Sequence, residues 1–351
     1  MTLYLRPLSL LHGPDARRAI AAGGAGALGG SDFIAFTQIQ LIERARGSVF
    51  KRVITYAEAQ RVHGELLDLI EARRPAFAGL AMNRPKLMGI VNVTPDSFSD
   101  GGQLANASEA AAHGARLASE GADILDIGGE STRPGSDPVP AEAELARILP
   151  VIEALTQQGH YISVDTRKAQ VMRQAAVAGA RIINDVSALS YDPEAVGTVA
   201  ALGLPVVLMH AQGDPKTMQN NPVYDDVTLD VFDMLNARIA QCEAAGIPRR
   251  LIAVDPGIGF GKTFHHNLTL LNELALFHGL GAVLLVGLSR KAFTGALTGE
   301  NKAADRVFGS VGGAIQAALN GAHILRIHDV KPTRQALAVA LAGADPEAAR
   351  L

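Results

Sequence analysis

Polar side chains that could bind an organic ring follow short apolar segments in the second part of the chain. Asp165, Asn184 and Asp255 stand at such places, and they offer planar hydrogen-bond acceptors, while Asn184 also offers donors. A carboxylate that is buried without a partner costs free energy, so these groups need something that donates to them. A flat heterocycle with adjacent N–H groups would meet that need.

Cationic side chains follow two further apolar segments nearer the C-terminus. Lys291 comes shortly after residues 283–287, and Arg326 and His328 stand at the end of residues 323–327. The loops after the seventh and eighth strands of a TIM barrel commonly bind phosphate. Together with the acceptors, these cations predict a site for a donor-rich ring that carries a phosphate or pyrophosphate.

Eight short apolar segments precede these polar groups and predict the strands that position them. They lack period-two alternation, as expected for strands of a parallel sheet that is buried on both faces. Helical spacing lies between them, for instance over residues 142–155, 229–244 and 301–319. Eight such units over about 260 residues predict an α/β fold, a (β/α)8 TIM barrel, with an open doubly wound sheet as the alternative. The apolar segments are residues 87–93, 124–128, 161–164, 182–186, 206–209, 251–254, 283–287 and 323–327.

The polar strand ends have a plain structural explanation as well, because Asp and Ser often cap the following helix. Asp192, Asp329 and Thr333 fit that explanation. It does not explain why successive apolar strands end in Asn, Asp, Lys or Arg. In a TIM barrel these strand ends converge on one mouth, where active sites lie, so we expect a catalytic mouth.

The chain changes character near Asn83, Arg84 and Pro85. Before this point come a Gly/Ala-rich stretch (19–30), a segment of strand-forming residues (33–56) and a helical segment (58–73). We expect residues 1–84 to form a small N-terminal extension or subdomain of unknown role. Residues 85–351 are expected to form the barrel.

Several weaker motifs do not meet their structural requirements. Residues 24–29 match G-x-G-x-x-G without a convincing preceding strand, and residues 257–263 miss the phosphate-loop spacing by one position. The ten histidines show no zinc-site spacing, and no nucleophile elbow follows a strand. We therefore expect neither a dinucleotide site nor a zinc hydrolase nor a serine hydrolase.

Composition excludes further classes. The 351 residues carry a formal net charge of −3 with interspersed signs, so a general nucleic-acid or anionic-membrane surface is not expected. Cys242 is the only cysteine, which suits a reducing, cytoplasmic compartment and a packing role for that thiol. No uncharged apolar run reaches the length of a membrane span, and Arg17–Arg18 do not precede a convincing export segment.

Eight motifs extend across residues 86–344. The longest are residues 88–102 (MGIVNVTPDSFSDGG) and 121–135 (GADILDIGGESTRPG). The others are ISVDTR at 162–167, IINDVS at 182–187, VLMH at 207–210, DPGIGFGK at 255–262, VGLSRK at 286–291 and RIHDV at 326–330. In sequence and in order, these eight segments resemble the dihydropteroate synthases.

The resemblance implies a Mg2+-assisted reaction in which the amine of p-aminobenzoate displaces pyrophosphate from 6-hydroxymethyl-7,8-dihydropterin pyrophosphate. By resemblance Asp255, Asn184, Asp165 and Lys291 would bind the pterin edges, with Met209 and Phe260 as apolar walls and Ser289 as a further substrate contact. Asn92, Arg326 and His328 would hold pyrophosphate, with Asn92 also at the metal. An electron-rich dihydropterin implies a loose, SN1-like substitution.

The resemblance also implies two loops, 94–102 and 131–135, that close over the site. Their residues would shape the p-aminobenzoate pocket (Phe98, Thr132 and Pro134) and lie near the metal and the anion (Asp100 and Arg133). Ala292 departs from the serine that the family often has there. Family members are typically homodimers through barrel helices, and residues 311–319 could contribute to such an interface.

Two rival interpretations remain at this stage. A pterin-binding methyltransferase domain shares the barrel and the pterin-edge carboxylates, but it would not need the cations at 289–291 and 326–328. A catalytically silent pterin binder would not need the whole set Asn92, Arg133, Lys291, Arg326 and His328. Both are therefore alternatives to the synthase.

Overall fold

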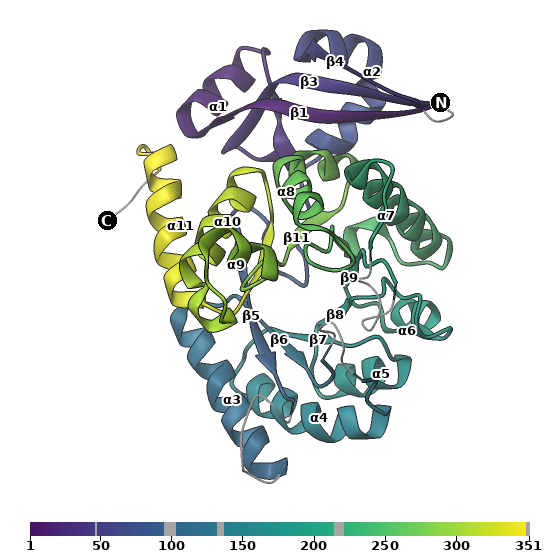
Figure 1. Cartoon of the computed structure of the whole chain (residues 1–351), viewed down its shortest axis with the longest axis vertical. Helices are drawn as coiled ribbons and strands as arrows, with labels where there is room; N and C mark the ends of the chain where they lie inside the picture. The colour runs from purple at the N-terminus through teal and green to yellow at the C-terminus, as the bar shows by residue number, and fades with distance from the viewer. Residues whose placement is uncertain (46–47, 95–102, 132–136, 214–220, 349–351) are drawn as a thin grey trace.

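A closed barrel of eight parallel strands forms the larger part of the structure (Figure 1). The computed structural model describes residues 1–45, 48–94, 103–131, 137–213 and 221–348. The strands close in the order β10-β11-β12-β5-β6-β7-β8-β9, so the first and last barrel strands, β5 and β12, are neighbours. The predicted (β/α)8 barrel is confirmed. The strands are β5 (Lys86–Asn92), β6 (Ile124–Gly128), β7 (Ile162–Asp165), β8 (Ile182–Asp185), β9 (Val206–Met209), β10 (Ile252–Asp255), β11 (Val283–Val286) and β12 (Ile324–Ile327).

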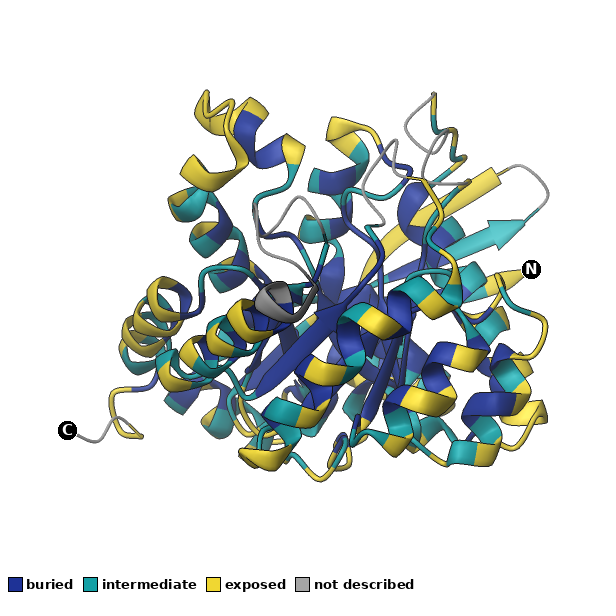
Figure 2. Ribbon diagram, turned by 90° about the horizontal axis from the view of Figure 1, so that it is seen from below, coloured by how far each residue is buried: buried dark blue, intermediate teal, exposed yellow. Residues whose placement is uncertain are grey.

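Burial on both faces explains why these strands are almost wholly apolar. Every residue of β6 to β11 is buried, and Figure 2 shows the strands as the buried centre of a shell of helices. The helices turn their apolar sides to the barrel and their polar sides to solvent. They are α3 (Gln103–Glu120), α4 (Ala141–Gln157), α5 (Ala169–Val177), α6 (Ala195–Leu202), α7 (Val227–Ala244), α8 (Phe264–Asn272), α9 (Ala292–Thr298), α10 (Val307–Leu319) and α11 (Val330–Ala344).

One predicted helix begins later than expected. Residues 301–319 were expected to be helical throughout, but α10 starts at Val307 and residues Ala303–Asp305 form only a 3-10 turn. Arg306 explains the difference, because its guanidinium donates to the carbonyls of Glu300, Asn301 and Arg290. Those bonds hold the segment in a turn that returns to the loop after β11.

The N-terminal residues form a second, antiparallel sheet. Its strands are β1 (Thr2–His12), β2 (Gly26–Ala27), β3 (Ile34–Ala45) and β4 (Ser48–Thr55), with β3 between β1 on one side and β2 and β4 on the other. Helices α1 (Gly13–Ala21) and α2 (Tyr56–Glu71) complete it, and Thr55 caps α2 by accepting from the Glu58 N–H. The expected strands in 33–56 and the helix in 58–73 are present, whereas β1 was not anticipated.

One face of this sheet lies against the barrel beside α7 (Figure 1). Tyr4 and Ile42 pack against Leu229 and Leu276, and the hydroxyl of Tyr4 donates to Asp233 at 2.9 Å. Ion pairs surround this apolar contact, with Arg6 on Glu273 at 2.9 Å, Arg44 on Asp230 at 2.7 Å and Lys51 on Asp226 at 3.0 Å.

The linker from α2 to β5 closes the bottom of the barrel. Phe77 is fully buried and packs with residues near the beginning of several strands, including Met88, Ile124 and Ile182. Access to the interior is therefore from the opposite end, where the strands finish. Among the described residues, no helix combines the length and the apolar character that crossing a membrane requires.

Candidate active site

Arg326 lies at the centre of the barrel mouth and contacts two carboxylates. Its Nε donates to Asp126 Oδ2 at 2.6 Å, and its Nη2 donates to Asp165 Oδ2 at 2.7 Å. Asn184 Nδ2 donates to the same Asp126 oxygen at 3.0 Å. Residues from β6, β7, β8 and β12 thus form one hydrogen-bonded group, which joins three predicted site residues through Asp126.

Asp126 was not predicted as a site residue. It occupies the middle of β6 and is fully buried, and its Oδ1 has no hydrogen-bond partner. The sequence does contain one indication that Asp126 belongs to the site, because it is a charged residue inside the otherwise apolar run Ile124–Gly128. The carboxylate orients both the amide of Asn184 and the guanidinium of Arg326.

Asp255 presents one oxygen to the site and anchors the other. Its Oδ1 accepts from the Gly257 N–H at 2.7 Å, while its Oδ2 lies 3.7 Å from the position a Cβ would take at Gly287. Met209 is the register partner of Asp255 on β9 and is buried beside it. An acceptor and an apolar surface therefore lie together, as the sequence predicted.

The two buried aspartates hold their protons more tightly than usual. Burial raises the pKa of Asp165 to about 7, although the charge of Arg326 opposes this. Burial raises the pKa of Asp255 to about 6, against the Gly257 N–H and the charges of Lys291 and Lys262. Groups with pKa values near neutrality in a barrel mouth are typical of a functional site.

Lys291 and Phe260 lie together on the loops after β11 and β10. The Lys291 ammonium is 3.8 Å from the centroid of the Phe260 ring, a cation–π contact. Gly259 makes this approach possible, because a Cβ there would come within 2.9 Å of Lys291 Cδ. Both predicted residues are half-buried, so a ligand can reach the charge and the ring.

Ser289 positions His328. The Ser289 hydroxyl accepts from the backbone N–H of His328 at 3.2 Å and lies 3.1 Å from the ring Nδ1. The hydroxyl can therefore donate to Nδ1 and leave Nε2 as the outer ring nitrogen. Ser289 and His328 were predicted separately and form one unit.

Asp329 departs from the expected capping role. It occupies the N-cap position of α11, but its carboxylate accepts from Arg290 Nε at 3.0 Å and Nη2 at 2.6 Å instead of capping the helix. Arg290 has a φ of 58°, which is unusual for a residue with a side chain. Asp192 acts as a turn residue, because it accepts from the Glu194 N–H at 2.9 Å, and it also accepts from the Ala169 N–H of the preceding helix α5 instead of capping α6.

Lys262 and His210 form a second group that the sequence interpretation did not assign. Lys262 Nζ lies 3.0 Å from His210 Nδ1 and 3.0 Å from the Phe260 carbonyl. Burial lowers the pKa of Lys262 to about 7 and that of His210 to about 3. This contact ties the end of β9 to the loop that carries Phe260.

Asn92 is half-buried at the end of β5, beside Gly128 in register. Its amide oxygen suits Mg2+, an ion that often takes one or two protein ligands and completes its shell with water and substrate phosphate. Within the described ranges, no cluster of three His, Cys, Asp or Glu side chains could hold a metal by itself. The described donors therefore fit a substrate-shared ion better than a closed protein site.

Five predicted site residues lie outside the described residues. They are Phe98, Asp100, Thr132, Arg133 and Pro134, in the loops after β5 and β6.

The barrel part of the chain is similar to known proteins. The family described as pterin binding enzyme matches residues 88–328. The dihydropteroate synthase of Escherichia coli (strain K12) is 49% identical over 261 residues, which cover 74% of this chain and 92% of that protein.

Solved structures give the same result. Xanthomonas albilineans dihydropteroate synthase with 4-aminobenzoic acid has a TM-score of 0.72 and 51% identity, covering 78% of this chain and 97% of the other. The same species' dihydropteroate synthase in complex with 7,8-dihydropteroate has a TM-score of 0.70 and 49% identity, covering 77% and 97%. The matched part includes the barrel.

Proposed function

This chain belongs to the dihydropteroate synthase family, and on that premise we propose a role for each group at the barrel mouth. The enzyme is a transferase of folate biosynthesis. It condenses 6-hydroxymethyl-7,8-dihydropterin pyrophosphate with p-aminobenzoate, giving 7,8-dihydropteroate and pyrophosphate. The geometric observation that best supports the proposed roles is the single group formed by Asp126, Asp165, Asn184 and Arg326.

The pterin ring is held by hydrogen bonds at its edges. Asp255 Oδ2, which faces Gly287, accepts from the adjacent N–H groups of the guanidine-like edge. Asp165 and Asn184 take the ring nitrogens farther along, and Lys291 donates to the carbonyl side. Met209 and Phe260 cover the flat faces. This assignment gives the buried carboxylates the donors they need.

Arg326 and His328 hold the pyrophosphate. Arg326 is shared between Asp126 and Asp165. A pyrophosphate oxygen competes with these carboxylates for the guanidinium, while pterin N–H groups satisfy the carboxylate of Asp165. Binding of the pterin therefore favours binding of the pyrophosphate group at Arg326, and the reverse also holds.

Mg2+ completes the anion site in this proposal. Asn92 would hold the ion, with Asp100 near it by resemblance, and the bound ion would neutralise charge on the departing pyrophosphate. By resemblance, Arg133 would add positive charge near the same anion. Phe98, Thr132 and Pro134 would shape the p-aminobenzoate pocket, while Ser289 contacts His328.

The reaction breaks the bond between the exocyclic methylene and pyrophosphate and forms a bond from that carbon to the arylamine nitrogen. The amine then loses a proton to solvent. Arg326 and His328 stabilise the negative charge that develops on the leaving group, so catalysis is mainly electrostatic. Loose substitution predicts a large secondary isotope effect at the methylene, whereas a negligible effect would contradict it.

The direct experiment measures pyrophosphate release by the purified chain with Mg2+ and the pterin pyrophosphate. Release that requires p-aminobenzoate, with 7,8-dihydropteroate as product, is the expected result. Tight pterin binding without product would instead favour a silent binder.

The proposal includes a homodimer in the cytoplasm. Phe308 on α10 is 88% exposed, and Val311 and Ile315 on the same helix are half-buried, which leaves an apolar strip on the barrel surface. Phe308→Glu is expected to produce monomers in sedimentation experiments. An unchanged mass would exclude this part of the helix from the interface.

A further inference from the structure

A cavity lies at the other end of the barrel from the mouth. Its volume is about 440 Å³, within the roughly 300–1,000 Å³ range typical of small-molecule sites. It is bounded by the N-terminal sheet (residues 28–34), the linker to β5 (73–85) and the turn before β12 (318–323). These barrel segments precede their strands, whereas the catalytic groups follow theirs, so the two sites are separate.

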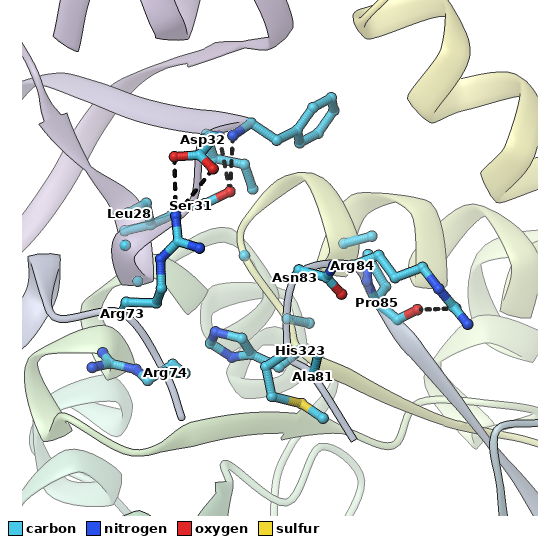
Figure 3. A pocket seen from close by; sticks show the side chains of 18 of the residues that line it. Leu28, Ser31, Asp32, Arg73, Arg74, Ala81, Asn83, Arg84, Pro85 and His323 are labelled. Carbon is cyan, nitrogen blue, oxygen red and sulfur yellow. Dashed lines mark hydrogen bonds and ion pairs between the residues drawn. The ribbon is translucent and has the colours of Figure 1, made fainter. Parts of the chain in front are cut away.

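The cavity is mainly apolar, with hydrogen-bond donors on several sides. Leu28, Ile34, Met82, Ala318 and Ala322 contribute the apolar lining. Figure 3 shows Ser31 on one side, Asn83 on another and the ring of His323 between the Arg73–Arg74 and Asn83–Arg84 segments. Such a lining favours a ligand with an apolar body and one polar end.

His323 presents an N–H to this space. Its Nδ1 accepts from the backbone N–H of Leu284 at 3.0 Å, and a backbone N–H can only donate. Burial lowers the pKa of His323 to about 3, so the neutral ring carries its proton on Nε2. A Cβ at Gly29, which lines the cavity, would lie 3.2 Å from Nε2.

Ser31 supplies a second donor. Its Oγ accepts from the N–H groups of Phe33 at 3.0 Å and Ile34 at 3.3 Å. Those bonds occupy the oxygen as an acceptor and leave its hydroxyl proton available for a ligand. Asn83 on the rim can donate through its amide.

A buried cation stands in the same wall. Arg74 is 5% exposed and donates to the carbonyls of Ala72, Leu69 and His278 at 2.9–3.0 Å. Among the described residues no carboxylate pairs with it, and its Nε has no hydrogen-bond partner. Burial and the charge of Arg249 lower its pKa only to about 10, so the charge persists at neutral pH.

The other arginines that line the cavity have carboxylate partners. Arg73 pairs with Asp32 at 3.0 Å, Arg84 pairs with Asp123 at 2.6 Å, and Arg17 pairs with Asp345 at 2.6 Å and with Glu347 at 3.0 Å. Of these arginines, Arg74 therefore lacks a carboxylate partner within the part of the chain that the structure describes. A single carboxylate would supply that partner, whereas a phosphate dianion would need cations that these pairs engage.

We propose that this cavity binds a small organic monocarboxylate, with its carboxylate toward His323, Ser31 and Arg74 and its apolar body against Met82 and the alanines. Such a ligand would contact the N-terminal sheet and the barrel at once. This gives residues 1–84 a binding function that is separate from the synthase reaction.

The experiment measures binding of 4-phenylbutyrate and octanoate to the full chain by calorimetry, with 4-phenylbutyramide as the neutral control. We expect one saturable site for a carboxylate, and at least tenfold weaker binding of the amide. Saturating p-aminobenzoate with pyrophosphate should leave this binding unchanged, because those ligands occupy the mouth.

Two matched variants locate the site. Ala81 is exposed and lines the cavity, so Ala81→Phe should fill it and abolish binding without disturbing the core. Ala244→Phe places the same group at an exposed position outside the cavity and should bind normally. The proposal is overturned if neither carboxylate binds, if the amide binds equally well, if p-aminobenzoate displaces the probe, or if Ala81→Phe retains binding.

Discussion

Arg326 lies between two carboxylates at the barrel mouth, and their hydrogen bonds affect how it binds an anion. Asp126 and Asp165 each accept a short hydrogen bond from the guanidinium. Burial by itself would lower the pKa of Arg326, but these charges raise it above its usual value. The arginine is therefore always charged, and its carboxylate partners set how much of that charge a ligand can use.

Asp126→Asn should make pyrophosphate bind more tightly while weakening pterin binding. The amide competes less with the anion for Arg326, and it orients Asn184 less firmly because the hydrogen bond loses its charge. We expect about tenfold stronger product inhibition by pyrophosphate, or about 1.4 kcal/mol, and a lower kcat/KM. If Asp126 had only a structural role, the substitution would weaken pyrophosphate binding and pterin binding together. Separate inhibition constants for pyrophosphate and for a pterin would distinguish the two cases.

Asp255→Asn should stabilise the ligand-free protein above pH 6 while reducing activity at least about 100-fold. The native pKa of Asp255 is raised to about 6, so the wild-type protein loses stability as pH rises from about 4 to 6. The amide has no such loss, and the gain should reach about 1–3 kcal/mol above pH 6 and vanish below pH 4. Denaturant unfolding at several pH values tests this, with Asp305→Asn as an exposed control.

At the residue scale, polar groups that end apolar strands could be located from the sequence, while their roles in the site stay predictions. Asp165, Asn184 and Asp255 stand at such ends, and Arg326 lies within the site that they form. Asp126 and Lys262 were missed because their importance arises from contacts between strands and loops that are distant in sequence. An isolated acid within an apolar run does not itself say which arginine it faces.

At the scale of elements, the N-terminal sheet contacts the beginning of α7. Arg44 on β3 contacts Asp230 at 2.7 Å, and Lys51 on β4 contacts the α7 N-cap Asp226. Tyr224, just before that N-cap, donates to the Gly261 carbonyl at 2.7 Å, next to Lys262. Residues 224–230 therefore connect the sheet to the loop that carries Phe260 and Lys262.

A double-mutant cycle on Arg44 and Asp230 should give a coupling free energy of about 1 kcal/mol, because these side chains are only 25% and 24% exposed. The pair Arg18 and Asp15 is the matched control, since both partners are more than two-thirds exposed and their coupling should be close to zero. Equal couplings for the two pairs in denaturant unfolding would contradict the role of burial.

Whether a strand could be predicted depended on how regular its pattern of apolar residues was. The barrel strands were found because both of their faces are buried and the sequence is continuously apolar. Strand β1 was missed because Pro7 and the polar residues around it interrupt the pattern, yet Pro7 pairs in register with Ile39. Its pairing with β3 is a long-range contact that local patterns do not encode.

At the scale of the whole molecule, the sheet and the barrel bury apolar side chains against each other. Tyr4 and Ile42 are buried against Leu229 and Leu276, and Phe77 closes the barrel from below. Without the other part, each would expose these apolar side chains to solvent. We therefore expect residues 1–84 and the barrel to unfold as one cooperative unit, in spite of their different architectures.

Hydrogen exchange at increasing denaturant concentration tests whether the sheet and the barrel unfold together. Amides of β3 and β8 should exchange with the same global free energy, because opening the sheet exposes the barrel side of the interface. Ile42→Ala should lower both free energies equally, by about 2–4 kcal/mol, since Ile42 is 1% exposed. Val62→Ala, at a position that is 58% exposed, should change neither. If β3 alone responds to Ile42→Ala, the sheet is an independent unit, and its ion pairs with α7 hold together two parts that are each stable without the other.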